Sequence, residues 1–97
     1  MFRHIVLFTW SAEATDDQKA TVAAELGKLT GVIPELRALA LGSDAGISAG
    51  NHDFALVADF DDVDGYTVYR DHPRHQAVIA EHIKPILAGR AAVQLQL

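Results

Sequence analysis

The side chains best suited to chemistry lie in one short stretch, Tyr69-Arg70-Asp71-His72-Pro73-Arg74-His75. An imidazole with an unperturbed pKa of about 6.5 can take and return protons near neutral pH. A phenol can donate a hydrogen bond to an oxygen on which negative charge develops. With His75 as the general base and Tyr69 as the hydrogen-bond donor, the stretch would suit proton abstraction next to a carbonyl.

A proline break positions these two side chains. Pro73 has no amide hydrogen and disfavours a helical conformation of His72, so the chain bends there and a new helix can begin. Tyr69 and His75 then lie on opposite sides of a corner that can bring them towards one place. A structural interpretation stays open, in which His75 caps or packs the corner, Tyr69 lies in the core and His72 hydrogen-bonds the backbone at the turn.

Four segments carry the patterns of strands. Residues 2–10 and 54–60 are rich in β-branched and aromatic residues and are apolar on both alternating faces, which predicts strands covered on both sides. Residues 36–42 form a third candidate. The last predicted strand, around Val93, Leu95 and Leu97, alternates apolar with polar side chains.

Two helical regions connect strands, and the second region is broken into two pieces. Thr15-Asp16-Asp17-Gln18 has the form of a capping box and predicts the start of the first helix. Asp61 or Asp62 can cap a second helix, which ends at the His72-Pro73 corner. A further helical piece follows the corner and ends at Gly89. On one side of this piece, at helical spacing, lie His75, Ile79, His82, Ile83 and Ile86.

The order β-α-β-β-α-β, with a broken second helix, predicts a ferredoxin-like plait of the α+β class in one domain, residues 1–97. Helices cover only one face of such a sheet. We expect the Val6, Phe8 and Trp10 set and the Phe54, Leu56 and Phe60 set to lie on faces that cannot both be under the helices. A second copy packed sheet to sheet would cover the exposed apolar face, which predicts a homodimer.

Composition excludes several classes of partner. Thirteen acidic and eight basic residues give a net charge of −5, without a run of Lys or Arg, which argues against nucleic acid. The apolar run of residues 5–8 is too short to cross a bilayer, so we expect a cytoplasmic protein without a membrane partner. The chain has no cysteine, and His72, His75 and His82 match no common zinc spacing, so no metal or cofactor is expected.

Three stretches carry a resemblance to a known family. They are Arg3-His4-Ile5-Val6-Leu7-Phe8, the strand within residues 51–60, and Tyr69-x-x-His72-Pro73-x-His75 followed by an apolar helix. With them the chain resembles, over nearly its whole length, the Dabb or stress-responsive α/β-barrel family. The His-Pro-x-His corner is the most specific part. The resemblance implies a dimeric α+β barrel.

The same resemblance implies roles for three residues. In the plant polyketide cyclase that makes olivetolic acid, the chemistry is carried by the second histidine of the corner and the tyrosine six residues before it, here His75 and Tyr69. An amino-terminal histidine that lines the same cavity is matched by His4. The pocket of this chain departs from that relative, because alanines and leucines stand where larger residues would grip a long alkyl tail. The cyclase substrate is therefore not carried over.

These observations predict one pocket between the sheet and the broken helix, with His4, Val6 and Phe8 on its wall beside His75 and Tyr69. His4 could equally supply pocket polarity or be a satisfied core histidine. One predicted function is binding of a small apolar or aromatic carbonyl compound, with cofactor-free chemistry of the cyclase, lyase or isomerase type. The alternative is a non-catalytic, stress-responsive dimer that binds a ligand or has a structural role.

Overall fold

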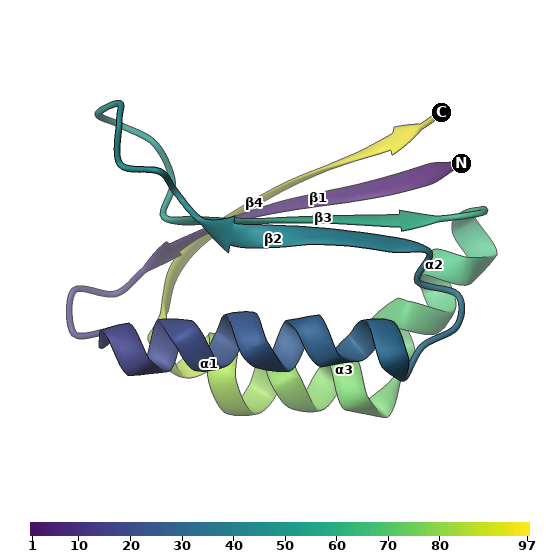
Figure 1. Ribbon diagram of the computed structural model, residues 1–97, viewed down its shortest axis with the longest axis horizontal. Helices are drawn as coiled ribbons and strands as arrows, with labels where there is room; N and C mark the ends of the chain where they lie inside the picture. Colours follow the sequence, from purple (N-terminus) through teal and green to yellow (C-terminus); the bar gives the residue numbers. More distant parts are fainter.

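The computed structural model describes all residues, Met1–Leu97, as a four-stranded antiparallel sheet with helices on one face (Figure 1). The strands are β1 (Phe2–Trp10), β2 (Ala38–Ser43), β3 (Phe54–Phe60) and β4 (Leu87–Gln96). Their order in the sheet is β2-β3-β1-β4, so the two central strands are β3 and β1. The predicted ferredoxin-like α+β plait is confirmed.

The first helix, α1 (Asp16–Gly27), begins at the predicted capping box. The amide of Gln18 donates to the Thr15 hydroxyl at 3.2 Å, and the amide of Thr15 donates to the side-chain carbonyl of Gln18 at 2.9 Å. The helix continues as a 3₁₀ turn, η1 (Lys28–Gly31). Its apolar stripe is buried in the core beneath the sheet and comprises Val22, Leu26 and Leu29.

The second helix is broken at the predicted corner. The carboxylate of Asp62 accepts a hydrogen bond from the Gly65 amide at 2.9 Å and begins α2 (Val63–Asp71). At the corner, Nδ1 of His72 accepts the amide hydrogen of Arg74 at 3.1 Å, which caps α3 (Pro73–Val78). The predicted turn hydrogen bond of His72 is therefore confirmed.

A π-helical turn, η2 (Ile79–Ile83), follows α3 and leads into a 3₁₀ turn, η3 (Lys84–Ile86). A π turn holds more residues than an α turn, so it rotates the side chains after it about the helix axis. His82 consequently lies in a different hollow from His75, together with Asp17 and Glu81. The predicted single face through His75, His82 and Ile86 is wrong for this reason.

Two other boundaries differ from the sequence prediction. The helical segment ends at Ile86, and Gly89 lies inside β4, where its amide and carbonyl belong to a strand that pairs with β1. The second strand begins at Ala38, and Leu36 before it is buried in the core. Both shifts follow from long-range packing that a local pattern does not contain.

The strand register places both predicted apolar sets on the same face. Phe8 pairs with Phe54 and Val6 pairs with Leu56 across β1 and β3, and directly paired residues share a face. All four are buried beneath the helices. The expectation that the two sets would occupy opposite faces is wrong, because it depended on a register that only the fold defines.

The opposite face of the sheet has no helix over it. Figure 1 shows the helices together on one side and the loop of residues 44–53 rising on the other. The apolar members of this uncovered surface, which we call the open sheet face, are Ile5, Leu7, Ala38, Ala40, Ala55, Val57, Ala91, Val93 and Leu95. Val93 remains 53% exposed and Leu95 37% exposed.

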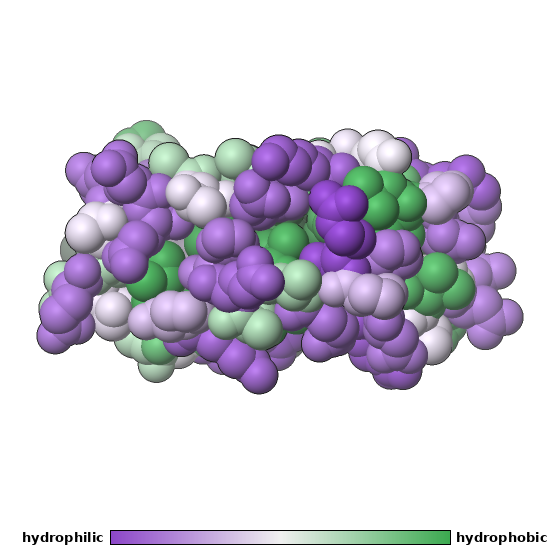
Figure 2. All heavy atoms as spheres, turned by 90° about the horizontal axis from the view of Figure 1, so that it is seen from below, coloured by the Kyte–Doolittle hydropathy of each residue, from purple (hydrophilic) through white to green (hydrophobic).

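The outer surface of the helix layer has a different character. Figure 2 views the molecule from the helix side and shows a mostly hydrophilic surface, with apolar atoms only in separate patches. None of the helices combines the length and the hydropathy that a membrane crossing requires. Val63 and Val68 of α2 are exposed apolar side chains of the helix layer, whereas the apolar side chains of the open sheet face are neighbours across paired strands.

Candidate functional site

A cavity of about 380 Å³ opens between the helix-covered face of the sheet and the broken second helix. This volume lies within the usual range of small-molecule sites, roughly 300–1,000 Å³. Most of its wall is apolar and comes from both layers, with contributions from Val6, Phe8, Leu26, Leu56, Ile79, Ile83 and Leu87. The cavity can therefore accept an apolar body.

The structure brings all five predicted site residues to this cavity: His4, Val6, Phe8, Tyr69 and His75. The first three alternate along β1 and so face the helices together. Tyr69 comes from the last turn of α2 and His75 from the short α3 beyond the corner. Their ring centroids are 4.1 Å apart.

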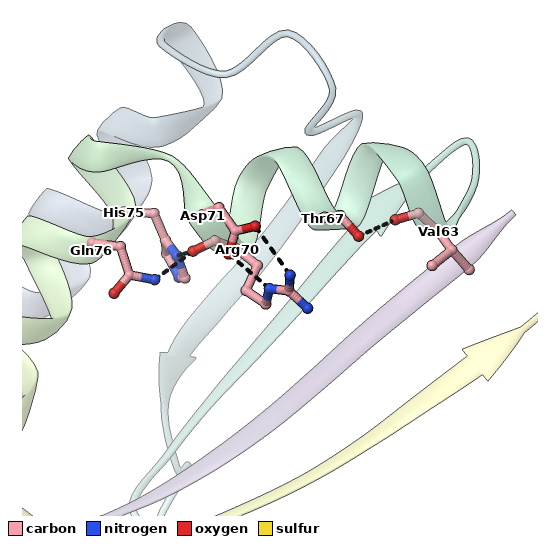
Figure 3. Close-up of polar contacts among 6 residues, drawn as sticks. All are labelled: Val63, Thr67, Arg70, Asp71, His75 and Gln76. Carbon is pink, nitrogen blue, oxygen red and sulfur yellow. Dashed lines mark hydrogen bonds and ion pairs between the residues drawn. The ribbon is translucent and has the colours of Figure 1, made fainter.

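The backbone of α2 holds the His75 ring. Nδ1 of His75 lies 3.1 Å from the carbonyl oxygen of Arg70, which also accepts a hydrogen bond from the side-chain amide of Gln76 (Figure 3). The Arg74 amide, which would otherwise bond this carbonyl, donates to His72 instead. A carbonyl oxygen can only accept, so Nδ1 of His75 carries the proton and Nε2 keeps its lone pair.

The surroundings of His75 favour the neutral ring. Burial lowers its pKa, the hydrogen bond to the Arg70 carbonyl opposes part of this change, and His72 lowers the pKa further. The ring is therefore mainly neutral at neutral pH. In this state Nε2 can accept a proton, as a general base must.

Tyr69 is almost fully enclosed, at 1% exposed, and its ring packs against Phe60 at a centroid distance of 5.2 Å. Burial raises the pKa of its phenol, so the hydroxyl keeps its proton and acts as a donor. No protein group bonds to this hydroxyl. The only fully buried polar side-chain atom without a partner is Nε1 of Trp10, so the Tyr69 hydroxyl keeps some accessible surface, and Tyr69 is one of the residues that line the cavity.

His4 is buried in β1 and forms a hydrogen bond with a side chain of β4. Its Nδ1 lies 3.1 Å from the amide nitrogen of Gln94, which can only donate, so the proton of the neutral ring is on Nε2. Burial, then Arg90 and then His75 lower the pKa of His4 to about 4. His4 is therefore neutral at neutral pH and supplies a second N–H donor at the cavity.

Five polar residues line the cavity without having been predicted there from the sequence: Tyr66, Arg70, Gln76, Lys84 and Arg90. Tyr66 stands one helical turn before Tyr69, so helical spacing could have identified it. Lys84 could not be found, because on an uninterrupted α-helix it would lie about two and a half turns beyond His75, on the opposite side. Arg90 depends on the register of β4, which pairs it with Phe8.

These features define a ferredoxin-like α+β domain with a partly polar internal cavity. The chain matches the stress responsive A/B barrel domain, Dabb, over residues 2–96 and therefore belongs to that family. The predicted family is confirmed. No curated protein matches the chain.

Solved structures agree with this assignment. The chain is similar to a dimeric ferredoxin-like protein of unknown function from Thermobifida fusca, with 51% identity, a TM-score of 0.91 and coverage of 99% of this chain and 90% of the other. It is also similar to a Dabb family protein from Mesorhizobium loti, with 21% identity, a TM-score of 0.81 and coverage of 99% and 95%. A hydroxynitrile lyase from Passiflora edulis shares the fold, with 20% identity, a TM-score of 0.86 and coverage of 99% and 92%.

Proposed function

We propose that this protein is a homodimer that binds a small apolar or aromatic carbonyl compound in the cavity of each protomer. It catalyses cofactor-free acid–base chemistry at the carbon next to the carbonyl. The observation that carries the proposal is the pair of groups on the cavity wall: a neutral His75 whose Nδ1 is committed to the Arg70 carbonyl, and a Tyr69 hydroxyl with no protein partner.

In the proposed reaction, Nε2 of His75 accepts a proton from the α-carbon of the bound compound. The electron pair of the broken C–H bond forms the C=C bond of an enolate, and the charge moves to the carbonyl oxygen. Tyr69 donates a hydrogen bond to that oxygen, and Nε2–H of His4 is available as a second donor. Return of the proton to carbon gives exchange or isomerisation. Attack of the enolate carbon on a second carbonyl forms a C–C bond, and His75 then protonates the new alkoxide.

The dimer in this proposal forms through the open sheet face. A contiguous apolar surface without a covering element is typical of an interface. The similar protein from Thermobifida fusca, at 51% identity, is described as dimeric. Because the cavity opens on the other side of the sheet, beneath the helices, both protomers keep an accessible site.

The direct test is a screen of ketones for exchange of the α-protons in heavy water, followed by NMR with and without the protein. We expect at least one compound with an apolar or aromatic group to exchange faster with the wild-type protein. The Tyr69→Phe variant should slow that exchange by roughly 10²–10³-fold, because it removes the oxyanion donor and keeps the ring. If no compound exchanges faster, the enzymatic proposal is wrong.

A non-catalytic ligand-binding dimer is the second candidate, and one observation favours it. His75 and Gln76 both bond the free carbonyl at the end of α2, so His75 has a structural role whether or not it meets a substrate. The screen separates the two functions. Compounds that bind in the cavity without any α-proton exchange would support the binding protein.

A further inference from the structure

The charged side chains that line the cavity are cationic, whereas the whole chain has a net negative charge. The protein has thirteen acidic and eight basic residues, yet no Asp or Glu lines the cavity. Three cationic side chains do: Arg70, Lys84 and Arg90. An acidic protein thus lines this largely apolar cavity with three cationic side chains and no anionic one.

Two of these three cationic side chains have no acidic partner in the protein. Arg70 forms an ion pair with its neighbour Asp71, with Nε and Oδ1 2.9 Å apart (Figure 3). Lys84 and Arg90 take part in no ion pair. They come from separate elements, the start of η3 and the middle of β4, and both are exposed at the cavity.

The backbone directly before Lys84 has a feature that is typical of functional sites. The π turn η2 lies directly before it, and this turn is what allows Lys84 and His75 to border the same cavity. Such turns occur frequently at functional sites. Arg90 also acts on the site electrostatically, because it contributes, after burial, to the lowered pKa of His4.

We infer that the ligand of this cavity carries one carboxylate, held at Lys84 and Arg90, on an apolar or aromatic body that extends between Val6 and Ile79. The inference rests on the proposed function, since it names the class of carbonyl compound: a keto acid. A phosphate is a poorer fit. Many phosphate sites add backbone amides from a glycine-rich loop, and no glycine lines this cavity.

The test compares benzoylpropionate, a stable aromatic keto acid, with its methyl ester by titration calorimetry on the intact protein. The two compounds share their body and their ketone, and differ in the charge. We expect the acid to bind the wild-type protein about tenfold more tightly, a modest factor because both cations are exposed. The preference should shrink as salt is raised from low to high concentration.

The double variant Lys84→Met/Arg90→Met should lose the preference, with the affinity for the ester unchanged. Each single variant should keep part of it, so the test does not depend on the folding of the double variant. Arg74→Met is the matched control: it removes the same charge from an exposed arginine that does not line the cavity, and the preference should persist.

Three results would overturn the inference: equal or tighter binding of the ester, a preference that survives in the double variant, or no binding of either compound. Phenyl phosphate provides a further arm, and tighter binding of it than of benzoylpropionate would reassign the anion to a phosphate ester. Exchange of the α-protons is measured separately. Preferential binding of the acid without exchange would leave the inference standing while the enzymatic proposal fails.

Discussion

The two faces of the sheet differ in where their polar groups lie. On the helix-covered face, polar side chains sit among the apolar ones, and the His4 ring and the Tyr69 hydroxyl reach the cavity without a full set of protein partners. On the open sheet face, polar side chains stand at the ends. Arg3 and Asp59 form an ion pair at 2.7 Å at one end, and Thr9 contacts His52 at 2.9 Å at the other.

This difference indicates what each face is suited to contact. Unpartnered polar atoms in an enclosed, mostly apolar space favour a ligand that carries both polar and apolar groups. A polar rim around a continuous apolar centre is the arrangement of a protein interface. Under the proposed function, one face of the sheet would contact a small molecule and the other a second copy of the chain.

The largest expected effect concerns the base on the helix-covered face. His75→Asn keeps a side-chain N–H that can bond the Arg70 carbonyl but removes the basic Nε2. We expect α-proton exchange to fall by roughly 10²–10⁴-fold. NMR in heavy water measures the rate, and a thermal melt should remain close to that of the wild type.

His75→Ala serves as the comparison for this variant. It removes both the base and the hydrogen bond that caps α2, so it should lose the exchange and also melt at a lower temperature. Exchange that persists in His75→Asn would show that another group is the base. The general base on the helix-covered face would then be a residue other than His75.

The next effect tests the open sheet face. Val93→Glu places a charge opposite Ile5 on an already exposed position, so the monomer should fold while the dimer weakens by about 100-fold or more in Kd. Analytical ultracentrifugation over a dilution series measures the change. Val68→Glu is the control, because Val68 is similarly exposed, at 44%, but lies on α2. Equal dimerisation of the two variants would place the interface elsewhere.

A smaller effect is a pH dependence that originates on the helix-covered face. The folded-state pKa of His4 is about 4 and its ordinary value is 6.5, so the unfolded chain binds more protons between these values. Stability is therefore full above pH 6.5 and declines as the pH falls towards 4. Since the cavity admits solvent, we expect a loss of roughly 1–2 kcal/mol.

Urea denaturation at several pH values and one protein concentration measures this decline. His4→Asn keeps an acceptor for Gln94 but does not titrate in this range, so its stability should depend less on pH. Some dependence should remain, because the pKa of His75 is also lowered. An unchanged pH profile in His4→Asn would contradict the assignment of a neutral, buried His4.

The smallest expected effect tests whether His72, at the corner, contributes only to stability. His72 caps α3 but does not line the cavity, so His72→Ala should lower the free energy of unfolding by about 1 kcal/mol. Because His72 also lowers the pKa of His75, exchange is compared at a pH where His75 is neutral in both proteins, and below the melting transition it should then match the wild type. A large loss of exchange with an unchanged melt would indicate that His72 takes part in the chemistry.

Local sequence determined the elements and the corner. The Thr15–Gln18 capping box, the Asp62 cap and the His72-Pro73 break each need only a few neighbouring residues, so their patterns predict them without knowledge of the fold. The same holds for Tyr69 and His75, which the break places on adjoining helices. These interactions are short in sequence, and a single sequence contains them in full.

Only the tertiary structure decided what each face presents. The pairing of Phe8 with Phe54 puts both apolar sets under the helices, and the contact of His4 with Gln94 joins residues 90 positions apart. The π turn moved His82 away from His75 and allowed Lys84 to reach the cavity. Strand register and helix rotation arise from long-range packing, whose energy is shared among many distant residues, and no local pattern records it.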